Sequence, residues 1–144
     1  MGMEVRKSNH SVYRLQYHVV CVTKYRLKLL NPGLRDHLKK ELYRQVKEMP
    51  GVEIQEINVQ KEHVHMMMVI PPRYAISEVV GRLKAKTAGV FCKRYKIFEK
   101  AYEQRGIMWS SGYFVSTVGI DEHVIRRYIK YQEDLDSGQM KFDL

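Results

Sequence analysis

The sequence has no apolar run as long as a transmembrane helix, and no charged and then apolar signal segment opens it. It also lacks the glycine-rich phosphate-binding loop of many ATP- and GTP-hydrolysing enzymes. Cysteine is scarce, because Cys21 and Cys92 are the only two and each lies among apolar residues. This excludes a disulfide framework or a cysteine-based zinc cluster. We therefore expect a cytoplasmic protein with reduced, buried thiols, no membrane partner and no use of ATP.

Acidic residues are few relative to basic ones. The 144 residues include 25 Lys and Arg against 16 Asp and Glu, which gives a formal net charge of +9. Such a surface attracts polyanions, of which nucleic acid is the commonest, with an anionic membrane surface as the competing partner. The length and the apolar content of 44% fit one globular domain over residues 1–144 with a single core.

Hydropathy periodicity predicts the order of helices and strands. Alternation places Tyr17, Val19 and Cys21 on one face of a first strand, and apolar residues at helical spacing mark three helices. We expect strands at 12–23, 52–60, 64–70 and 113–118, and helices that begin at Asn31, near Ser77 and at Asp121. This order predicts an α+β fold: a ferredoxin-like β-α-β-β-α-β antiparallel sheet with an added C-terminal helix.

Local signals add detail to these elements. Asn31 before Pro32 is typical of a helix N-cap, and the alternation slips by one near Glu56, which predicts a β-bulge. The strand at 64–70 is apolar on both faces and is therefore expected in the middle of the sheet. The predicted apolar stripe of the last helix consists of Val124, Tyr128, Tyr131 and Leu135.

Two histidines flank Val64 where the third predicted strand begins. Side chains at i and i+2 of a strand project from one face, so His63 and His65 point at one spot from positions about 7 Å apart. One metal ion bridges such a span, and neutral imidazole is a common ligand for divalent metals. Two ligands do not complete a site, however, and most such pairs are surface or hydrogen-bonded histidines.

A tyrosine and a glutamine lie four residues apart on the last predicted helix and so share one face of it. Tyr128 is a candidate covalent nucleophile, because nearby positive charge favours its phenolate. Basic neighbours supply that charge at Arg126, Arg127 and Lys130. From spacing alone a core role for Tyr128 is favoured, since it lies on the apolar stripe.

Five stretches of the sequence resemble a known family in order and spacing. They are "YHVVCVTKYR" at 17–26, "EHVHMMMVIPP" at 62–72, "VVGRLKAKTA" at 79–88, "MWSSGYFVSTVG" at 108–119 and "VIRRYIKYQ" at 124–132. Each stretch alone is unspecific, but together they cover nearly the whole chain. The sequence resembles the single-tyrosine HUH transposases of the insertion-sequence 200/605 family, especially the insertion-sequence 200 group.

The resemblance implies roles for four residues. His63, His65 and Gln132 would hold a divalent metal, Mg²⁺ or Mn²⁺, and Tyr128 would be the catalytic nucleophile. It further implies a homodimer with active sites shared between chains, which binds single-stranded DNA with hairpins at the ends of a mobile element. The expected function is metal-dependent cleavage and strand transfer of single-stranded DNA through a 5′-phosphotyrosine, which moves an insertion sequence.

The sequence departs from the family pattern at two positions. Tyr131 stands where the family usually has Asn, which creates a second candidate nucleophile about 60° round the helix from Tyr128. We prefer Tyr128, because it keeps the spacing of four to Gln132. Ala85 stands between two lysines where glycine is commoner, and we expect it to be tolerated.

Basic and aromatic residues near the motifs are candidates for contact with DNA. Lysine and arginine bind phosphates, and aromatic rings stack on bases, although a charge run is more often a solvated face. Trp109 is at least as well explained by packing. The predicted DNA-binding residues are Arg14, Lys24, Tyr25, Arg26, Arg82, Lys84 and Lys86.

Other functions fit parts of the sequence. A repeat-associated HUH endonuclease would use the same chemistry on host palindromes, and the sequence of the chain does not separate it from a mobile-element transposase. A non-catalytic module that binds single-stranded nucleic acid would not need the two histidines, the tyrosine and the glutamine together. An inactive transposase remnant stays open because of Tyr131.

Overall fold

A four-stranded antiparallel sheet forms the centre of the computed structural model, which describes residues 6–7, 12–13, 15–117 and 122–138. From one edge to the other, the strands are β4 (Glu53–Val59), β5 (His63–Val69), β3 (Gln16–Val22) and β6 (Phe114–Ser116). The chain order is strand, helix, strand, strand, helix, strand and helix, as predicted, with short additional elements. The strand that carries the histidines lies inside the sheet, also as predicted.

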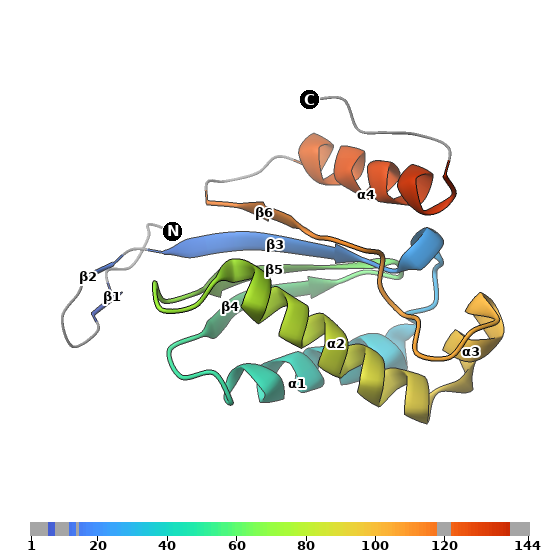
Figure 1. Cartoon of the computed structure of the whole chain (residues 1–144), viewed down its shortest axis with the longest axis horizontal. Helices are drawn as coiled ribbons and strands as arrows, with labels where there is room; N and C mark the ends of the chain where they lie inside the picture. Colours follow the sequence, from blue (N-terminus) through green and yellow to red (C-terminus); the bar gives the residue numbers. More distant parts are fainter. Residues whose placement is uncertain (1–5, 8–11, 14, 118–121, 139–144) are drawn as a thin grey trace.

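The helices lie on both faces of this sheet. Figure 1 shows α1 (Pro32–Val46) and α2 (Ile76–Arg94) side by side under one face, and α4 (Glu122–Asp136) alone over the other. The smaller elements are a hairpin of β1 (Arg6–Lys7) and β2 (Val12–Tyr13), a 3₁₀ turn η1 (Lys24–Arg26), and α3 (Lys96–Tyr102). None of the helices in the described ranges is long and apolar enough to cross a bilayer.

Strand alternation determines which side chains face α1 and α2. Val19 and Cys21 of β3, and Val64, Met66 and Met68 of β5, belong to the large core cluster and are at most 2% exposed. Helical spacing brings the leucines of α1 and the buried residues of α2 onto the same cluster. The hydrophobic effect thus anchors these two helices firmly and leaves the other face of β3 and β5 to α4.

Two local predictions are confirmed. The side chain of Asn31 accepts a hydrogen bond from the backbone N–H of Leu34 at 3.0 Å, with Pro32 as the first residue of α1. The pairing of β4 with β5 shifts register between Ile54 and Glu56, which is the predicted bulge. The bulge leaves Asn58 paired with His65, so the polar end of β4 lies beside the histidine strand.

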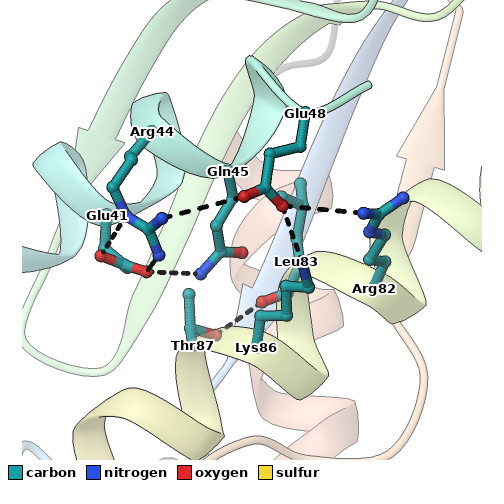
Figure 2. A network of polar contacts seen from close by, with 8 residues as sticks. All are labelled: Glu41, Arg44, Gln45, Glu48, Arg82, Leu83, Lys86 and Thr87. Atoms are coloured by element: carbon teal, nitrogen blue, oxygen red, sulfur yellow. Dashed lines mark hydrogen bonds and ion pairs between the residues drawn. The ribbon is translucent and has the colours of Figure 1, made fainter. Parts of the chain in front are cut away.

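A polar network connects α2 with α1 and with Glu48, which follows the end of α1. Glu48 pairs with Lys86 at 2.8 Å and with Arg82 at 3.6 Å, while Arg44 pairs with Glu41 one turn earlier on α1 (Figure 2). Exposed ion pairs contribute little stability each. The network matters here because two of its cations are predicted DNA contacts.

The opposite face of the sheet holds a much smaller apolar cluster. Val20 and Val22 of β3 pack against Ile129 of α4, and Phe114, Ile125 and Tyr128 lie around them. The predicted stripe of α4 was therefore wrong in part, because Ile129 is 6% exposed whereas Leu135 is 40% exposed. The short branched side chains of β3 accept an isoleucine, and the end of α4 that bears Leu135 is held by polar contacts instead.

Three other predictions differ from the structure. The strand expected at 12–23 is interrupted, since β2 pairs with β1 and only β3 joins the main sheet. The helix α3 was missed, and Cys92 is half-buried rather than buried, whereas Cys21 is buried as expected. The predicted cap at Asp121 lies outside the described residues.

Candidate active site

The two histidines of β5 lie in a cleft between the sheet and α4. The strand turns His63 and His65 toward α4, while Val64 between them is buried on the other face at 1% exposure. The cleft has a volume of about 420 Å³. It is lined by Arg26, Asn58, Gln60, Glu62, His63, His65, Ile125, Arg126 and Ile129.

Each histidine has one ring nitrogen in a defined polar contact. Nδ1 of His63 lies 2.8 Å from a carboxylate oxygen of Glu62. Nε2 of His65 lies 3.1 Å from Nδ1 of His18, which projects from β3 with its ring centroid 5.3 Å away. These contacts fix the orientation of both rings, and each uses one of the two ring nitrogens.

The electrostatics of the cleft favour a neutral imidazole at His65. Burial lowers the pKa of the His65 ring, and the neighbouring His18 and His63 lower it further. The neutral form is the one that binds metal ions. The placement of the two imidazoles on one strand face therefore fits half of a divalent metal site, and at His65 the lowered pKa fits it as well.

The predicted nucleophile and the predicted third ligand contact each other on α4. Nε2 of Gln132 donates to the hydroxyl oxygen of Tyr128 at 2.7 Å and to the carbonyl oxygen of Ser111 at 2.7 Å. The Tyr128 ring packs 5.5 Å from Phe114 and 6.2 Å from Tyr131, and burial raises the pKa of its phenol. Tyr128 is thus a seated, protonated side chain in this arrangement.

The amide oxygen of Gln132 is the unusual atom of this group. It is buried and has no hydrogen-bond partner among the described residues, although the side chain is only 3% exposed. A buried acceptor without a partner costs about 1–3 kcal/mol, so its retention suggests a ligand. An amide oxygen together with two imidazoles is a donor set that fits Mg²⁺ or Mn²⁺.

The two halves of the predicted site do not share one cleft in this chain. The residues that α4 contributes to the histidine cleft are Ile125, Arg126 and Ile129. Tyr128 instead packs on Phe114 of β6, and Gln132 bonds Ser111 before that strand. A different placement of α4, or a second copy of the chain, would bring a Tyr128 to the histidine cleft.

The segment Ser110–Gly112 holds α4 through hydrogen bonds to Gln132 and Asp136. The Lys84 ammonium of α2 donates to the carbonyl oxygens of Ser110 at 2.7 Å and Gly112 at 2.6 Å. Gly112 has a φ of 79°, and a Cβ there would lie 3.4 Å from Nε2 of Gln132. A glycine in the left-handed region thus lets the loop approach the glutamine closely enough to bond it.

The comparisons with known proteins decide the family. The family described as "Transposase IS200 like" matches residues 11–132. This chain belongs to the IS200-like transposases. It is 31% identical over 127 residues to the transposase for insertion sequence element IS200 of Salmonella typhimurium, covering 88% of this chain and 82% of that one. It is also 31% identical over 136 residues to the ISDra2 transposase TnpA of Deinococcus radiodurans, covering 93% and 95%.

A solved structure agrees with this result. The crystal structure of a protein from Deinococcus radiodurans R1, assigned as a transposase, superimposes with a TM-score of 0.75 at 28% identity and covers 88% of this chain and 97% of that one. The transposase family predicted from the sequence motifs is thereby confirmed. The α+β fold with a four-stranded antiparallel sheet is that of an IS200-family transposase.

The predicted DNA-binding residues of this IS200-like transposase have different surroundings. Tyr25 is 43% exposed, and Arg82 and Lys86 pair with Glu48 at the surface of α1 and α2 (Figure 2). Lys84 is instead half-buried between two carbonyl oxygens, and burial lowers its pKa. The remaining predictions are Lys24 in η1, Arg26 in the histidine cleft, and Arg14, which lies outside the described residues.

Some residues around the candidate site were missed in the sequence analysis or left there with two possible roles. Trp109, whose two readings were open, donates its indole N–H to Thr87 at 2.9 Å and packs on the core, which favours the packing role. His18 was recognised only as part of a polar strand face, because its contact with His65 depends on the pairing of β3 with β5, in which His18 lies opposite Met67 and His65 lies opposite Val20. Glu133 and Asp136 carried no signal, because acidic residues at a helix end are common.

Proposed function

We propose that this IS200-like transposase cleaves and rejoins single-stranded DNA with Tyr128 as the nucleophile and with the help of a divalent metal. One observation carries the proposal. His63 and His65 present two oriented imidazoles to a cleft that is roofed by α4, the helix that bears Tyr128 and Gln132. The ferredoxin-like order of strands and helices supports it, because β5 and α4 meet across one sheet face.

The residues of the chain would divide the chemistry among them. His63, His65 and the amide oxygen of Gln132 would hold Mg²⁺ or Mn²⁺, which supplies charge neutralisation and Lewis acidity at a phosphate. The phenolic oxygen of Tyr128 attacks the scissile phosphorus, and its proton leaves to solvent or a nearby base. A new bond forms between this oxygen and phosphorus, and the bond from phosphorus to the 3′ oxygen breaks.

The products of this step make the reaction reversible. One DNA strand carries its 5′ phosphate on Tyr128, and the other ends in a free 3′-OH. The 3′-OH of another strand attacks the phosphotyrosine and restores a phosphodiester, so no nucleotide is hydrolysed. This agrees with the absence of a glycine-rich phosphate loop from the sequence.

We further propose that the active form is a homodimer with shared sites that binds the hairpins at the ends of an insertion sequence. Support comes from the separation of Tyr128 and Gln132 from the histidine cleft within one chain. The net charge of +9 suits the phosphate backbone, and the exposed Tyr25 suits an unstacked base.

A covalent-adduct assay tests the function. The protein is incubated with Mn²⁺ and a pool of single-stranded DNA that includes the sequences flanking its gene, and is then run on a denaturing gel. We expect a protein–DNA adduct that is absent with Tyr128→Phe and retained with Tyr131→Phe. Both variants change only a hydroxyl on neighbouring, partly buried rings, which makes them a matched pair. If only Tyr131→Phe lost the adduct, the nucleophile would be Tyr131 and not Tyr128.

A further inference from the structure

The turn between β3 and α1 has an unusual backbone. Tyr25 has φ 58° and Arg26 has φ 56°, so two consecutive residues other than glycine lie in the left-handed region. Such residues cost about 1–3 kcal/mol each and persist only where the surroundings hold them. Part of that hold comes from α4, because a carboxylate oxygen of Asp136 accepts the backbone N–H of Tyr25 at 2.8 Å.

The side chain of Arg26 contacts α4 and also lines the histidine cleft. Its Nη1 donates to a carboxylate oxygen of Glu133 on α4 at 2.9 Å, and the same side chain lines the histidine cleft with His63 and His65. The pair is partly open to solvent, with side chains 38% and 37% exposed. One guanidinium thus connects the cleft to the helix that carries Tyr128.

The C-terminal end of α4 depends on these polar contacts. The apolar contacts of α4 come from Ile125, Tyr128 and Ile129, in the first two thirds of the helix. Its last turns are held by Glu133 on Arg26, by Asp136 on Tyr25 and Ser110, and by Gln132 on Ser111. The turn η1 is therefore one of two segments that hold the end of α4, beside residues 110–112, and η1 is the one with a strained backbone.

We propose that Arg26 is a positioning residue that exchanges Glu133 for a DNA phosphate and thereby releases the C-terminal end of α4. The inference rests on the proposed function, since it assumes that a phosphate of single-stranded DNA enters the histidine cleft. Occupation of the cleft then frees the helix that bears Tyr128 and Gln132. Without DNA, the ion pair helps to keep α4 in the position in which Tyr128 contacts Phe114 and Gln132.

Magnitudes favour such an exchange. An exposed ion pair is a weak contact, whereas guanidinium and phosphate form short, charge-assisted and often bidentate hydrogen bonds. Glu133 does not lose all its partners, because Nζ of Lys130 already lies 4.0 Å from the same carboxylate oxygen. Release also permits η1 to relax from its left-handed conformation.

The first test measures DNA affinity, with Tyr128→Phe in every protein so that no cleavage occurs. The probe is a fluorescent pool of random-sequence single-stranded oligonucleotides, followed by anisotropy. Glu133→Gln frees Arg26 and should raise affinity by about fivefold, which is the upper value of an exposed ion pair, about 1 kcal/mol, converted at 1.4 kcal/mol per tenfold. Asp36→Asn removes an acid from the exposed Lys40 pair on α1 and should change affinity less than about twofold.

The role of Arg26 is isolated by a double-mutant cycle. In an Arg26→Gln background, Glu133→Gln should have no more effect than Asp36→Asn, while in an Arg26→Lys background part of the gain should return. An equal gain from Glu133→Gln with and without Arg26 would mean a general charge effect and would overturn the proposal.

The second test measures hydrogen exchange at the backbone amides of α4. DNA should raise exchange over residues 130–136, and Glu133→Gln should show the raised exchange without DNA. Binding of DNA that leaves this exchange unchanged, or lowers it, overturns the release of α4. The adduct assay is separate, so an adduct without release refutes only the inference, and release without an adduct refutes only the proposed function.

Discussion

Nδ1 of His18 lies 3.1 Å from Nε2 of His65, on the neighbouring strand of the sheet. The family resemblance assigns no role to His18, yet this residue contacts the ring of a proposed metal ligand. We expect His18→Leu to lower Mn²⁺ affinity by about 10- to 100-fold, the usual cost of losing a residue that orients a ligand. Calorimetric titration with Mn²⁺ measures this without any DNA.

Two further variants make this prediction specific. His18→Asn keeps a polar atom near the position of Nδ1 and should restore part of the affinity. His123→Leu removes an exposed histidine of α4 and should leave affinity unchanged. Equal Mn²⁺ affinity in His18→Leu and the wild type would show that Glu62, the main chain and packing suffice to orient the cleft.

The sequence predicted well those features that depend on local periodicity. Alternation around Val64 placed His63 and His65 on one face, and the slip at Glu56 located the bulge. Spacing of four placed Tyr128 against Gln132. Each of these follows from the geometry of a single strand or helix, which the sequence encodes directly.

Features that depend on tertiary contacts were not predictable. The spacing of α4 does not indicate that Ile129 rather than Leu135 packs on the sheet. This contact depends on Val20 and Val22 of β3, which lie far from α4 in the sequence. Likewise, the contact of Arg26 with Glu133 joins residues 107 positions apart. The separation of Tyr128 from the histidine cleft has the same origin, since it depends on how α4 is docked.

Removal of the proposed metal ligands should separate cleavage from DNA binding. His63→Ala and His65→Ala each leave one imidazole, which is too few to hold a divalent ion with a single amide oxygen. We expect loss of the covalent adduct with nearly unchanged affinity for single-stranded DNA in anisotropy. Excess EDTA should reproduce this in the wild type, and full cleavage in EDTA would refute the metal requirement.

Lys84 and Lys86 are both predicted DNA contacts, but the structure distinguishes them. Lys84→Met leaves the carbonyl oxygens of Ser110 and Gly112 without their charged donor, so unfolding free energy should fall by about 1–3 kcal/mol in urea denaturation. Lys86→Gln breaks only an exposed pair with Glu48 and should stay within about 0.5 kcal/mol of the wild type.

In DNA binding we expect the Lys86 variant, and not the Lys84 variant, to differ from the wild type. If Lys86 contacts a phosphate, the slope of log affinity against log salt should become shallower by about 0.7 in Lys86→Gln. The Lys84 ammonium already donates to the carbonyl oxygens of Ser110 and Gly112. Folded Lys84→Met should therefore show the same salt slope as the wild type. A salt slope that is unaltered in Lys86→Gln would remove this residue from the DNA-binding surface.

The last prediction concerns which chain supplies the tyrosine. Within one chain, α4 contributes Ile125, Arg126 and Ile129 to the histidine cleft, so a dimer with shared sites would combine the histidines of one copy with Tyr128 of the other. His65→Ala and Tyr128→Phe should each be inactive alone. The two variants are coexpressed with different tags, the mixed dimer is purified through both, and adduct formation on single-stranded DNA is measured.

The mixed dimer distinguishes the two arrangements by symmetry. In the shared arrangement one of its two sites combines a wild-type histidine cleft with a wild-type tyrosine, so about half of the wild-type activity per dimer should return. In the within-chain arrangement each site keeps one defect, and no activity returns. An inactive mixed dimer, confirmed as intact by mass, would assign Tyr128 to the cleft of its own chain. In that case α4 must move within the chain, because its present seat turns Tyr128 toward Phe114 and Gln132.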